Sequence, residues 1–531
     1  MAFLLAGLLL VALALYLRLK VFIGAQPGGV DTWYYLASAD ALRRHKRLPI
    51  SLPQYLFHER HESYPAVFPA ALALLPEDWL RRNFWLVSPL VDTVHLLLLY
   101  LLSYRLTDSV LAATTAGLIY AVTPQLISET RNLNGRAFAS LLQTLAMLAL
   151  LRSAIPSVGP SRALVGGNML APTIVAVVLI ALLYNTHTST TIAFLVSTAT
   201  LTVASDQPRF LLLGLLGLPF AILLSGGYYL RVLRNHVCAA RFWFRNVRLT
   251  RAHQVKDSPV LHPEAETGTS PRAAAGLYRP TWRSWLGLGA RLLGENPFIL
   301  PMLITPPPDN VWARAMYLWA AAILVWAALT TFVPPLRILG PGFHYMKASV
   351  FPTAYVLAVS VNVQEGAFSP VGLALLIAVI ASFGALAYFY RLMALRRTEH
   401  TAQTPPDLAA AAQYLSTLPG RNVLVLPNMY ADFVSYNAGK AVLWGGHSGD
   451  LTKLEDFFPV LRQPISFFFQ RYDVDYLLLD LAYTTPEELR SASLVAPVQR
   501  FGAIALYEVV RAPSAESPPL SPTRQAAAAP T

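Results

Sequence analysis

The sequence is poor in cysteine and in charged residues. Its 531 residues include a single cysteine, Cys238, and only 13% are Asp, Glu, Lys or Arg, whereas about 25% is usual for a soluble protein. One cysteine excludes an intramolecular disulfide and a metal site built from several cysteines. Hydrophobic residues make up 55% of the chain, so the composition predicts an integral membrane protein with more than one hydrophobic span.

The sequence signatures of soluble nucleotide and hydrolase chemistry are also missing. No P-loop, GxSxG, Rossmann or HExxH pattern occurs. The net charge is +12, but the basic residues are spread over loops rather than gathered in a compact basic domain. We therefore expect no nucleic-acid partner, and we expect these residues to meet anionic membrane lipids or a lipid phosphate.

Long apolar runs define a predicted membrane domain over residues 1–397. The first run, from Ala2 to about Ile23, is longer than a usual signal-peptide core, so we interpret it as a retained helix whose Arg18 and Lys20 reach the surface. Further spans are predicted near 84–104, 109–123, 137–154, 170–185, 188–204, 209–229, 286–305, 311–333, 348–364 and 370–390, about eleven helices in all. The run at 286–305 is the weakest because polar residues and Pro297 interrupt it.

Two long polar loops, 24–83 and 231–285, separate these spans. Part of the first should lie on the bilayer as an amphipathic helix, and the second is predicted to be extended. Residues 407–511 predict a small soluble α/β domain with a helix over 408–418 and strands at 422–426, 441–444, 476–481 and 503–510. The tail 512–531 is predicted to be disordered.

The predicted orientation follows from the basic residues beside the spans. With the amino terminus inside and eleven spans, both long loops and the C-terminal domain lie outside, and short inside segments carry Arg105 and Arg152, as the positive-inside tendency predicts. Arg391, Arg396 and Arg397 favour the opposite orientation. If 286–305 does not cross, the C-terminal domain turns inside.

An acidic residue, Asp31, follows the first apolar run within Gly28-Gly29-Val30-Asp31-Thr32-Trp33-Tyr34-Tyr35. It could simply cap a helix that begins there. At the membrane surface it could instead accept the proton of an acceptor hydroxyl or amine during a transfer reaction.

Other polar residues lie in short connections between spans, and the predicted orientation puts these connections at the same membrane face as Asp31. Those that could bind a lipid-linked phosphate donor are Glu129, Arg131, Asn132, Arg136, His344, Tyr345 and Lys347, with Arg279 or Arg283 as further cations. Each has a structural alternative. Glu129 and Arg131 could pair locally, Lys347 could anchor its helix at the interface, and His187, in another of these connections, could be a helix-end histidine.

A cluster of histidines and carboxylates occurs in the first long loop. His58, Glu59, His61 and Glu62 could bind a divalent metal, although their spacing is not a specific signature. They could equally be solvated loop residues.

The segment Val30 to Tyr35 resembles the acidic motif of GT-C fold glycosyltransferases, and Tyr64-Pro65 with Phe68-Pro69 ahead of a new span is similar to the same family. The resemblance covers about residues 1–510 and includes, distantly, oligosaccharyltransferase catalytic subunits and protein mannosyltransferases. It implies a polytopic membrane domain, an outward-facing site, a soluble C-terminal α/β domain, and a polyprenyl-phosphate- or polyprenyl-diphosphate-linked sugar as donor.

This chain departs from the oligosaccharyltransferase pattern at two places. The region 124–136 looks like the second outer loop of the family, but Asn134-Gly135-Arg136 stands where oligosaccharyltransferases have paired aspartates, which leaves the metal open. Asn428-Met429-Tyr430-Ala431-Asp432 stands where they carry a Trp-Trp-Asp-Tyr-Gly motif, and this difference counts against an Asn-X-Ser/Thr protein acceptor.

The sequence thus predicts a GT-C type hexosyl- or pentosyltransferase of the inner or plasma membrane, with about eleven transmembrane helices and a small α/β domain. It would transfer a sugar from a polyprenyl-phosphate-linked donor to a glycan, lipid or protein acceptor at the extracytoplasmic face, with Asp31 as the base or the acceptor-orienting group. Three alternatives stay open: a polysaccharide polymerase or ligase, a lipid-linked-sugar transporter or flippase, and a non-catalytic assembly or sensor subunit. A flippase would carry polar residues at mid-membrane on broken helices.

Overall fold

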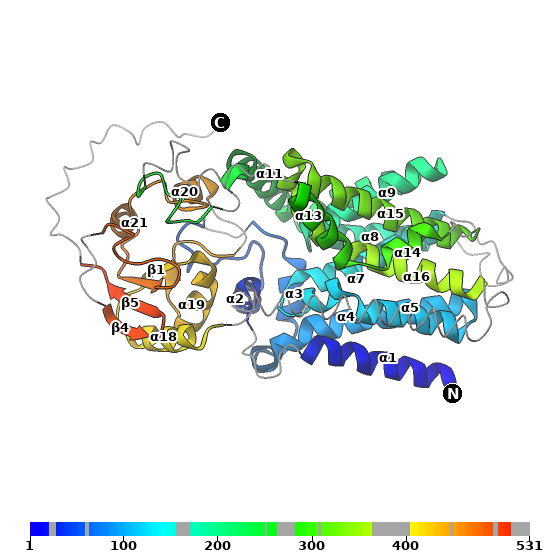
Figure 1. Ribbon diagram of the computed structural model, residues 1–531, viewed down its shortest axis with the longest axis horizontal. Coiled ribbons are helices and arrows are strands. Elements are labelled where there is room, and N and C mark those ends of the chain that lie inside the picture. Colours follow the sequence, from blue (N-terminus) through cyan, green and yellow to red (C-terminus); the bar gives the residue numbers. More distant parts are fainter. Residues whose placement is uncertain are drawn as a thin grey trace.

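The structure, a computed structural model, describes residues 1–20, 28–58, 63–154, 170–249, 252–262, 282–305, 309–363, 404–446, 450–491 and 497–510. A bundle of helices forms one end of the molecule and a five-stranded sheet with its own helices forms the other, with α2 (Val30–His45) between them (Figure 1). The sheet therefore lies beyond one end of the bundle rather than beside it.

The helical part is built from helices that follow each other closely along the chain. After α1 (Ala2–Leu19) and α2 come α3 (Val67–Ala73), α4 (Glu77–Thr107), α5 (Val110–Val122), α6 (Pro124–Glu129), α7 (Gly135–Ala154), α8 (Leu170–Tyr184), α9 (Thr188–Ser205), α10 (Arg209–Leu224), α11 (Tyr228–Asn246), η3 (Val247–Leu249), α13 (Trp282–Glu295), α14 (Ile299–Ile304), α15 (Val311–Phe332), η5 (Pro334–Leu339), η6 (Gly342–His344) and α16 (Lys347–Val363).

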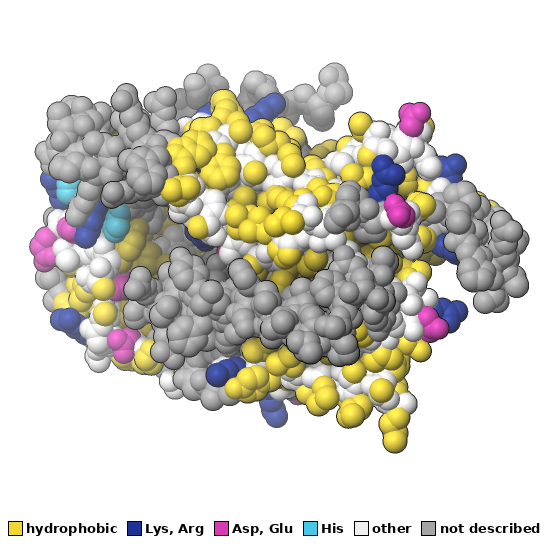
Figure 2. Space-filling view, turned by 45° about the vertical axis from the view of Figure 1, so that its right-hand side comes forward, with side chains coloured by type: hydrophobic (Ala, Val, Ile, Leu, Met, Phe, Trp, Pro, Cys, Tyr) yellow, Lys and Arg dark blue, Asp and Glu magenta, His cyan; other side chains and the backbone are white. Residues whose placement is uncertain are grey.

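Five of the described helices, α1, α4, α7, α9 and α15, are long and apolar enough to cross a membrane, and the bent pair α10 and α11 is a sixth candidate. Two shorter apolar helices, α5 and α8, pack among them. Hydrophobic side chains cover much of the visible surface of the helical part (Figure 2). The chain is therefore an integral membrane protein. The predicted number of eleven spans is not confirmed, and the span predicted at 370–390 lies outside the described residues.

Two stretches differ from their prediction. Residues 286–305 do not form one span: α13 ends at Glu295 and α14 starts at Ile299, because Pro297 cannot continue a helix that would need its backbone N–H. The loop predicted at 231–285 is helical over its first part, as α11 reaches Asn246. Its arginines make the segment polar overall, but its apolar residues follow a helical period.

A charged pair is buried among the membrane helices. The Nη2 atom of Arg18 on α1 lies 2.5 Å from the Oδ2 atom of Asp92 on α4, and the Tyr120 hydroxyl donates to Asp92 Oδ1 at 2.8 Å. Arg18 also donates to the carbonyl of Ala121 at the end of α5. The prediction that Arg18 reaches the surface is therefore wrong. A charge in apolar surroundings needs a partner, so this pair holds α1 against α4 and α5.

The sheet has the order β2-β1-β3-β5-β4. The elements of this part are α18 (Pro406–Thr417), β1 (Asn422–Leu426), η8 (Asn428–Tyr430), α19 (Ala431–Ala438), β2 (Ala441–Val442), α20 (Leu451–Phe457), α21 (Ile465–Arg471), β3 (Tyr476–Asp480), β4 (Pro497–Phe501) and β5 (Ile504–Glu508). Strands β2, β1 and β3 are parallel, and β5 and β4 are antiparallel. The strand β4 was not predicted, because its residues are mostly exposed and show no buried alternation.

Both faces of the sheet are covered. Val423 and Val425 of β1 join the core shared with the bundle, whereas Leu424 and Leu426 join a second core. A strand buried on both faces reads as a continuous apolar run, which is why Asn422–Leu426 was recognisable in the sequence.

The loop after α2 joins the membrane part to the sheet. Tyr55 forms a parallel bridge with Val442, and the backbone N–H of Phe57 donates to the carbonyl of Leu443 at 2.8 Å. On α2 itself, the ring of Trp33 lies edge-on to Phe433 of α19, with centroids 5.1 Å apart. These contacts fix the sheet against α2, and α2 carries Asp31.

Candidate functional site

The start of α2 is held by the loop that precedes α7. Gly29 caps the helix with φ 108° and ψ 149°, and a Cβ atom there would lie 2.3 Å from Asn132 Cγ. In the amide orientation that satisfies its neighbours, Asn132 Nδ2 donates to the carbonyls of Gly28 at 3.0 Å and Arg131 at 2.9 Å. Only glycine fits this close approach at a positive φ, which explains Gly29 at the start of this helix.

Asp31 is not the helix cap. It lies in the first turn of α2 after Gly29, so the capping interpretation is wrong. The helix dipole favours a negative charge in the first turn of a helix. The carboxylate of Asp31 faces Arg136 at the start of α7.

Arg136 lies between two carboxylates. Its Nη2 atom is 3.8 Å from Asp31 Oδ2, and its Nη1 atom is 3.3 Å from Glu129 Oε2. Asn134 fixes the turn between these residues, because its Nδ2 donates to the Glu129 carbonyl at 2.7 Å and its Oδ1 accepts from the Arg136 backbone N–H at 2.9 Å. The predicted alternative, in which Glu129 pairs locally with Arg131, is replaced by this contact with Arg136.

Glu129, at the end of α6, is the most enclosed carboxylate of this cluster. Gln125 Nε2 donates to its Oε1 at 3.3 Å, and His344 Nδ1 lies 3.5 Å from the same oxygen. Burial by itself would raise the pKa of Glu129, but Arg136 and Lys347 outweigh it and hold that pKa well below its usual range. Burial lowers the pKa of His344, so Glu129 is ionised and His344 is neutral near pH 7.

Lys347, the first residue of α16, is buried beside Glu129. Its side chain is 5% exposed, and its Nζ atom has no hydrogen-bond partner among the described residues. The predicted alternative of a lysine that anchors its helix in the surface layer does not fit this burial. A buried ammonium without hydrogen bonds is costly unless an anion completes its surroundings.

Three further predicted residues have structural contacts. The Tyr345 hydroxyl donates to the carbonyl of Leu339 and its ring packs against Trp326, so it supports the turn before α16. Asn132 braces Gly28, as described above, and Arg131 is buried next to it. Arg279 lies outside the described residues, and nothing is described of the side chain of Arg283.

His187, for which the sequence allows either a helix-end role or a place among the polar residues of the site, adjoins the same charges. It precedes α9, and its Nδ1 atom is 3.1 Å from both Thr190 Oγ1 and Ser189 Oγ. Burial holds the pKa of His187 well below its usual value, and the charges of Lys347 and Arg136 lower it further. No motif marks it in the sequence. Its only signal was a polar residue in a short connection at the level of Asp31.

Of the four residues in the predicted metal cluster, the structure describes only His58. Its Nε2 atom lies 3.0 Å from the carbonyl of Gly445, and Glu59, His61 and Glu62 lie outside the described residues. Within the described ranges no three His, Cys, Asp or Glu side chains gather to hold a metal ion. The Asp31 and Glu129 carboxylates do not fit a divalent cation either, because the Arg136 guanidinium lies between them and Lys347 adds a second positive charge.

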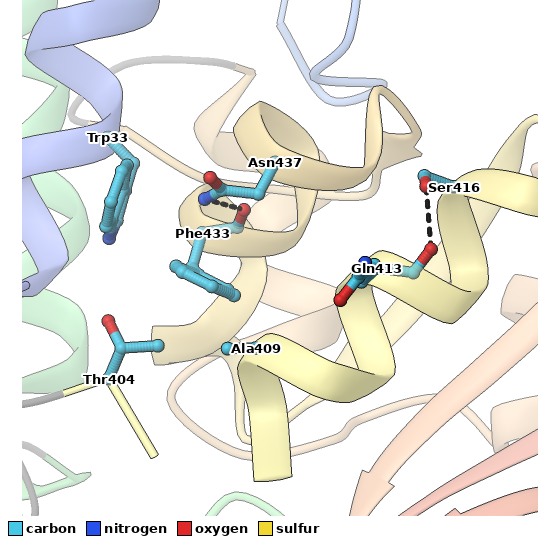
Figure 3. A pocket seen from close by; sticks show the side chains of 7 residues that line it. All are labelled: Trp33, Thr404, Ala409, Gln413, Ser416, Phe433 and Asn437. Atoms are coloured by element: carbon cyan, nitrogen blue, oxygen red, sulfur yellow. Dashed lines mark hydrogen bonds between the residues drawn. The ribbon is translucent and has the colours of Figure 1, made fainter. Parts of the chain in front are cut away.

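A separate pocket of about 350 Å³ lies between α2 and the sheet part, lined by Trp33, Thr404, Ala409, Gln413, Ser416, Phe433 and Asn437. Trp33 reaches from α2 toward Phe433, across from α18 with Gln413 and Ser416 (Figure 3). Trp33 is two residues after Asp31, so the two side chains point to nearly opposite faces of α2. The pocket lining is uncharged, so the groups able to hold an anion lie on the Asp31 face.

The arrangement of membrane helices, a polar site at one end of the bundle and a small mixed sheet beyond it defines a membrane protein of the GT-C fold, as the resemblance predicted. The structure is similar to that of the archaeal oligosaccharyltransferase AglB from Archaeoglobus fulgidus in complex with an inhibitory peptide and a dolichol-phosphate. The TM-score is 0.56 with 13% identity, and the match covers 90% of this chain and 69% of that chain.

Two other solved structures support the same fold. ArnT from Cupriavidus metallidurans bound to undecaprenyl phosphate matches with a TM-score of 0.52 and 12% identity, over 95% of this chain and 97% of that chain. The Archaeoglobus fulgidus oligosaccharyltransferase in complex with Zn and sulfate matches with a TM-score of 0.54 and 16% identity, over 90% and 68%. No protein-family model and no curated protein matches the chain. At these identities the similarity shows the fold, and the chemistry must be argued from the site.

Proposed function

We propose that the chain transfers a sugar from a polyprenyl-phosphate-linked donor to an acceptor at the extracytoplasmic membrane face, with Asp31 as the catalytic base. The observation that carries the proposal is the pair of cations at one end of the bundle: Arg136 between Asp31 and Glu129, and the buried Lys347 ammonium without a hydrogen-bond partner among the described residues. A phosphate oxygen is the ligand that completes such a site.

The proposed reaction is a single displacement. The acceptor oxygen or nitrogen attacks the anomeric carbon, Asp31 takes the proton from that nucleophile, and the bond from the anomeric carbon to the phosphate oxygen breaks with its electron pair on the phosphate. Arg136 and Lys347 stabilise the charge that develops on the leaving lipid phosphate. Glu129 orients Arg136 and keeps the ammonium of Lys347 charged. His187 adjoins this phosphate position, and Arg131, buried in the same connection as Asn132, is included in the proposed site as a further cation.

Two observations support the proposed donor and face. The neighbouring folds are solved with dolichol-phosphate and with undecaprenyl phosphate, so a phosphate on a long isoprenoid chain is the natural probe. Arg105 and Arg152 lie in the last turns of α4 and α7, whereas Arg136 starts α7 at the Asp31 end. By the positive-inside tendency, these positions favour an outside location for Asp31.

The activity test uses the full chain in lipid nanodiscs with radiolabelled polyprenyl-phosphate sugars and a membrane glycan fraction as acceptor. Asp31→Asn should lower transfer by about 100- to 10,000-fold while binding of undecaprenyl phosphate is retained. Asp206→Asn, at the exposed end of α9, is the matched control and should keep full activity. Transfer by Asp31→Asn at the wild-type rate would reject the role of Asp31.

The proposed face is tested separately. Cys238 lies on α11, at the Asp31 end of the bundle (Figure 1). A membrane-impermeant maleimide should therefore label it in intact cells after removal of any outer barrier. Labelling only after the membrane is opened would place the site in the cytoplasm.

The transporter alternative predicts polar residues deep in the membrane. Arg18 and Asp92 form a buried charged pair, but Arg18 lies in the last turn of α1. Both groups are almost fully buried and contact each other, Tyr120 and backbone carbonyls, so the pair joins helices rather than offering a charge to a substrate. Movement of a fluorescent polyprenyl-phosphate sugar across liposomes without glycosyl transfer would favour the transporter.

A further inference from the structure

The helix α11 runs across the direction of the spanning helix before it. The bend between α10 and α11 is 119°, and two glycines with positive φ, Gly226 and Gly227, make the turn. Figure 1 shows α11 at the boundary between the bundle and the sheet part, near α20. A helix in this position lies along the membrane surface rather than through it.

Successive residues of a helix are turned by about 100°, and this divides the surface of α11 into stripes. Leu230, Leu233, Val237 and Phe244 form an exposed apolar stripe. Arg231, Arg234, Arg241 and Arg245 form an exposed basic stripe directly beside it. The opposite face is the one that packs, through Val232, Phe242 and Asn246.

The basic stripe is largely unneutralised. The helix contains no acidic residue, and Arg231, Arg234 and Arg241 have no ion-pair partner in the part of the chain that the structure describes. Arg245 alone of the four has one there, Glu455, at 3.6 Å. Three exposed guanidinium groups beside four exposed apolar side chains match the composition of helices that lie in the headgroup layer of a bilayer.

We propose that α11 is an interfacial helix that binds anionic phospholipid headgroups. The apolar stripe enters the acyl-chain boundary, and the basic stripe, about a quarter-turn away, meets the phosphates. Charge complementarity selects this occupant. Zwitterionic headgroups would satisfy the apolar stripe equally, but only an anionic surface offers net attraction to Arg231, Arg234 and Arg241, which have no ion-pair partner among the described residues. The bend at Gly226 and Gly227 orients α11 for this contact.

The single cysteine provides the probe, because Cys238 is partly exposed and lies on the basic side of α11. The full chain is labelled there with a fluorophore and placed in phosphatidylcholine nanodiscs. Two nanodisc samples are compared. In one, a small share of the lipid is phosphatidylglycerol that carries a nitroxide quencher close to the headgroup; in the other, the same share is phosphatidylcholine with the same quencher. The ratio of quenching in the two samples gives the preference of α11 for the anionic lipid. The measurement requires no enzymatic activity, so its result does not depend on whether the chain transfers a sugar.

At low salt, we expect each of Arg231, Arg234 and Arg241 to raise the preference of the labelled chain for phosphatidylglycerol over phosphatidylcholine by about fivefold. The triple variant Arg231→Gln, Arg234→Gln, Arg241→Gln should lose this preference, and the corresponding lysine variant should keep most of it. The control is Arg421→Gln, Arg471→Gln, Arg500→Gln, which removes the same charge from exposed positions of the sheet part and should change nothing.

Three results would overturn the proposal. Equal quenching by the two lipids would exclude selection of anionic headgroups. An equal loss in the control variant would assign the preference to net charge alone. No quenching by either lipid would mean that protein, rather than bilayer, covers α11.

Discussion

Arg136 lies with its Nη2 atom 3.8 Å from the Oδ2 atom of Asp31, so the first residues of α7 and of α2 meet at one end of the bundle. The same guanidinium reaches Glu129 at 3.3 Å through Nη1. One cation thus joins the starts of α2 and α7 to the end of α6. Because both carboxylates depend on this cation, the charges of the site are coupled to the packing of the helices that carry them.

Arg136→Gln should destabilise the chain strongly. Glu129 would lose its hydrogen-bonded cation while staying buried, and breaking a buried pair by removing one partner costs about 3–5 kcal/mol. Thermal unfolding in detergent measures the loss. Arg136→Lys should recover part of it, whereas Arg152→Gln, at the other end of α7, should have little effect. An unfolding temperature unchanged in Arg136→Gln would show that Glu129 does not depend on this contact.

Lys347→Met should separate stability from binding. Removing a buried ammonium without hydrogen bonds relieves a desolvation cost that outweighs its attraction to Glu129, so stability should change little. Binding of undecaprenyl phosphate should weaken by about 10- to 100-fold. The contrasting variant is Lys440→Met, because Lys440 Nζ donates to the carbonyls of Leu418 and Gly420. That variant should lose stability and keep lipid binding. Unchanged lipid binding in Lys347→Met would remove Lys347 from the phosphate site.

Stability should fall with acidification in two steps. His344 and Glu129 lie in connections outside the spanning helices, and both have a pKa below the usual values of 6.5 and 4.5. Each group whose pKa is depressed on folding contributes stability above its unfolded pKa and loses that contribution as the pH drops through its folded pKa. Unfolding measured from pH 8 to 3 should therefore show a decline beginning below about 6.5 and steepening below about 4.5. His344→Gln should reduce the upper part, to which His187 also contributes, and Glu129→Gln should remove the lower part. A stability profile of the wild type that is flat over this range would contradict both assignments.

Gly29→Ala should disturb the start of α2. The new Cβ would meet Asn132 Cγ at 2.3 Å in a backbone conformation with φ 108°, a combination that costs about 1–3 kcal/mol from strain before the clash is added. The measurement is again thermal unfolding, combined with the transfer assay, since Asp31 would move with the helix. Gly294→Ala in α13 is the control, because a Cβ there meets nothing within 4 Å, and it should be neutral or slightly stabilising.

Asp92→Asn should weaken the attachment of α1. It leaves the Arg18 guanidinium buried with its charge unpaired, which costs about 3–5 kcal/mol. The double variant Arg18→Met, Asp92→Leu replaces both charges by apolar side chains and should recover most of the loss. A double variant as unstable as Asp92→Asn would contradict the view that Arg18 and Asp92 serve only to join α1 to α4.

The sequence by itself determined the membrane class, because apolar runs longer than a bilayer core have no soluble alternative, and it determined β1, whose continuous apolar residues suit a strand covered on both faces. It also picked out Asp31, Glu129, Arg136, His344 and Lys347 as polar residues next to apolar runs. Their pairing could not be read from it, because which carboxylate meets which cation depends on how α2, α7 and α16 pack. For the same reason the sequence left a local pair of Glu129 and Arg131 open, put Arg18 at the surface and joined α13 to α14. Only the tertiary structure decided these contacts, since a buried charge selects its partner by distance in space and not along the chain.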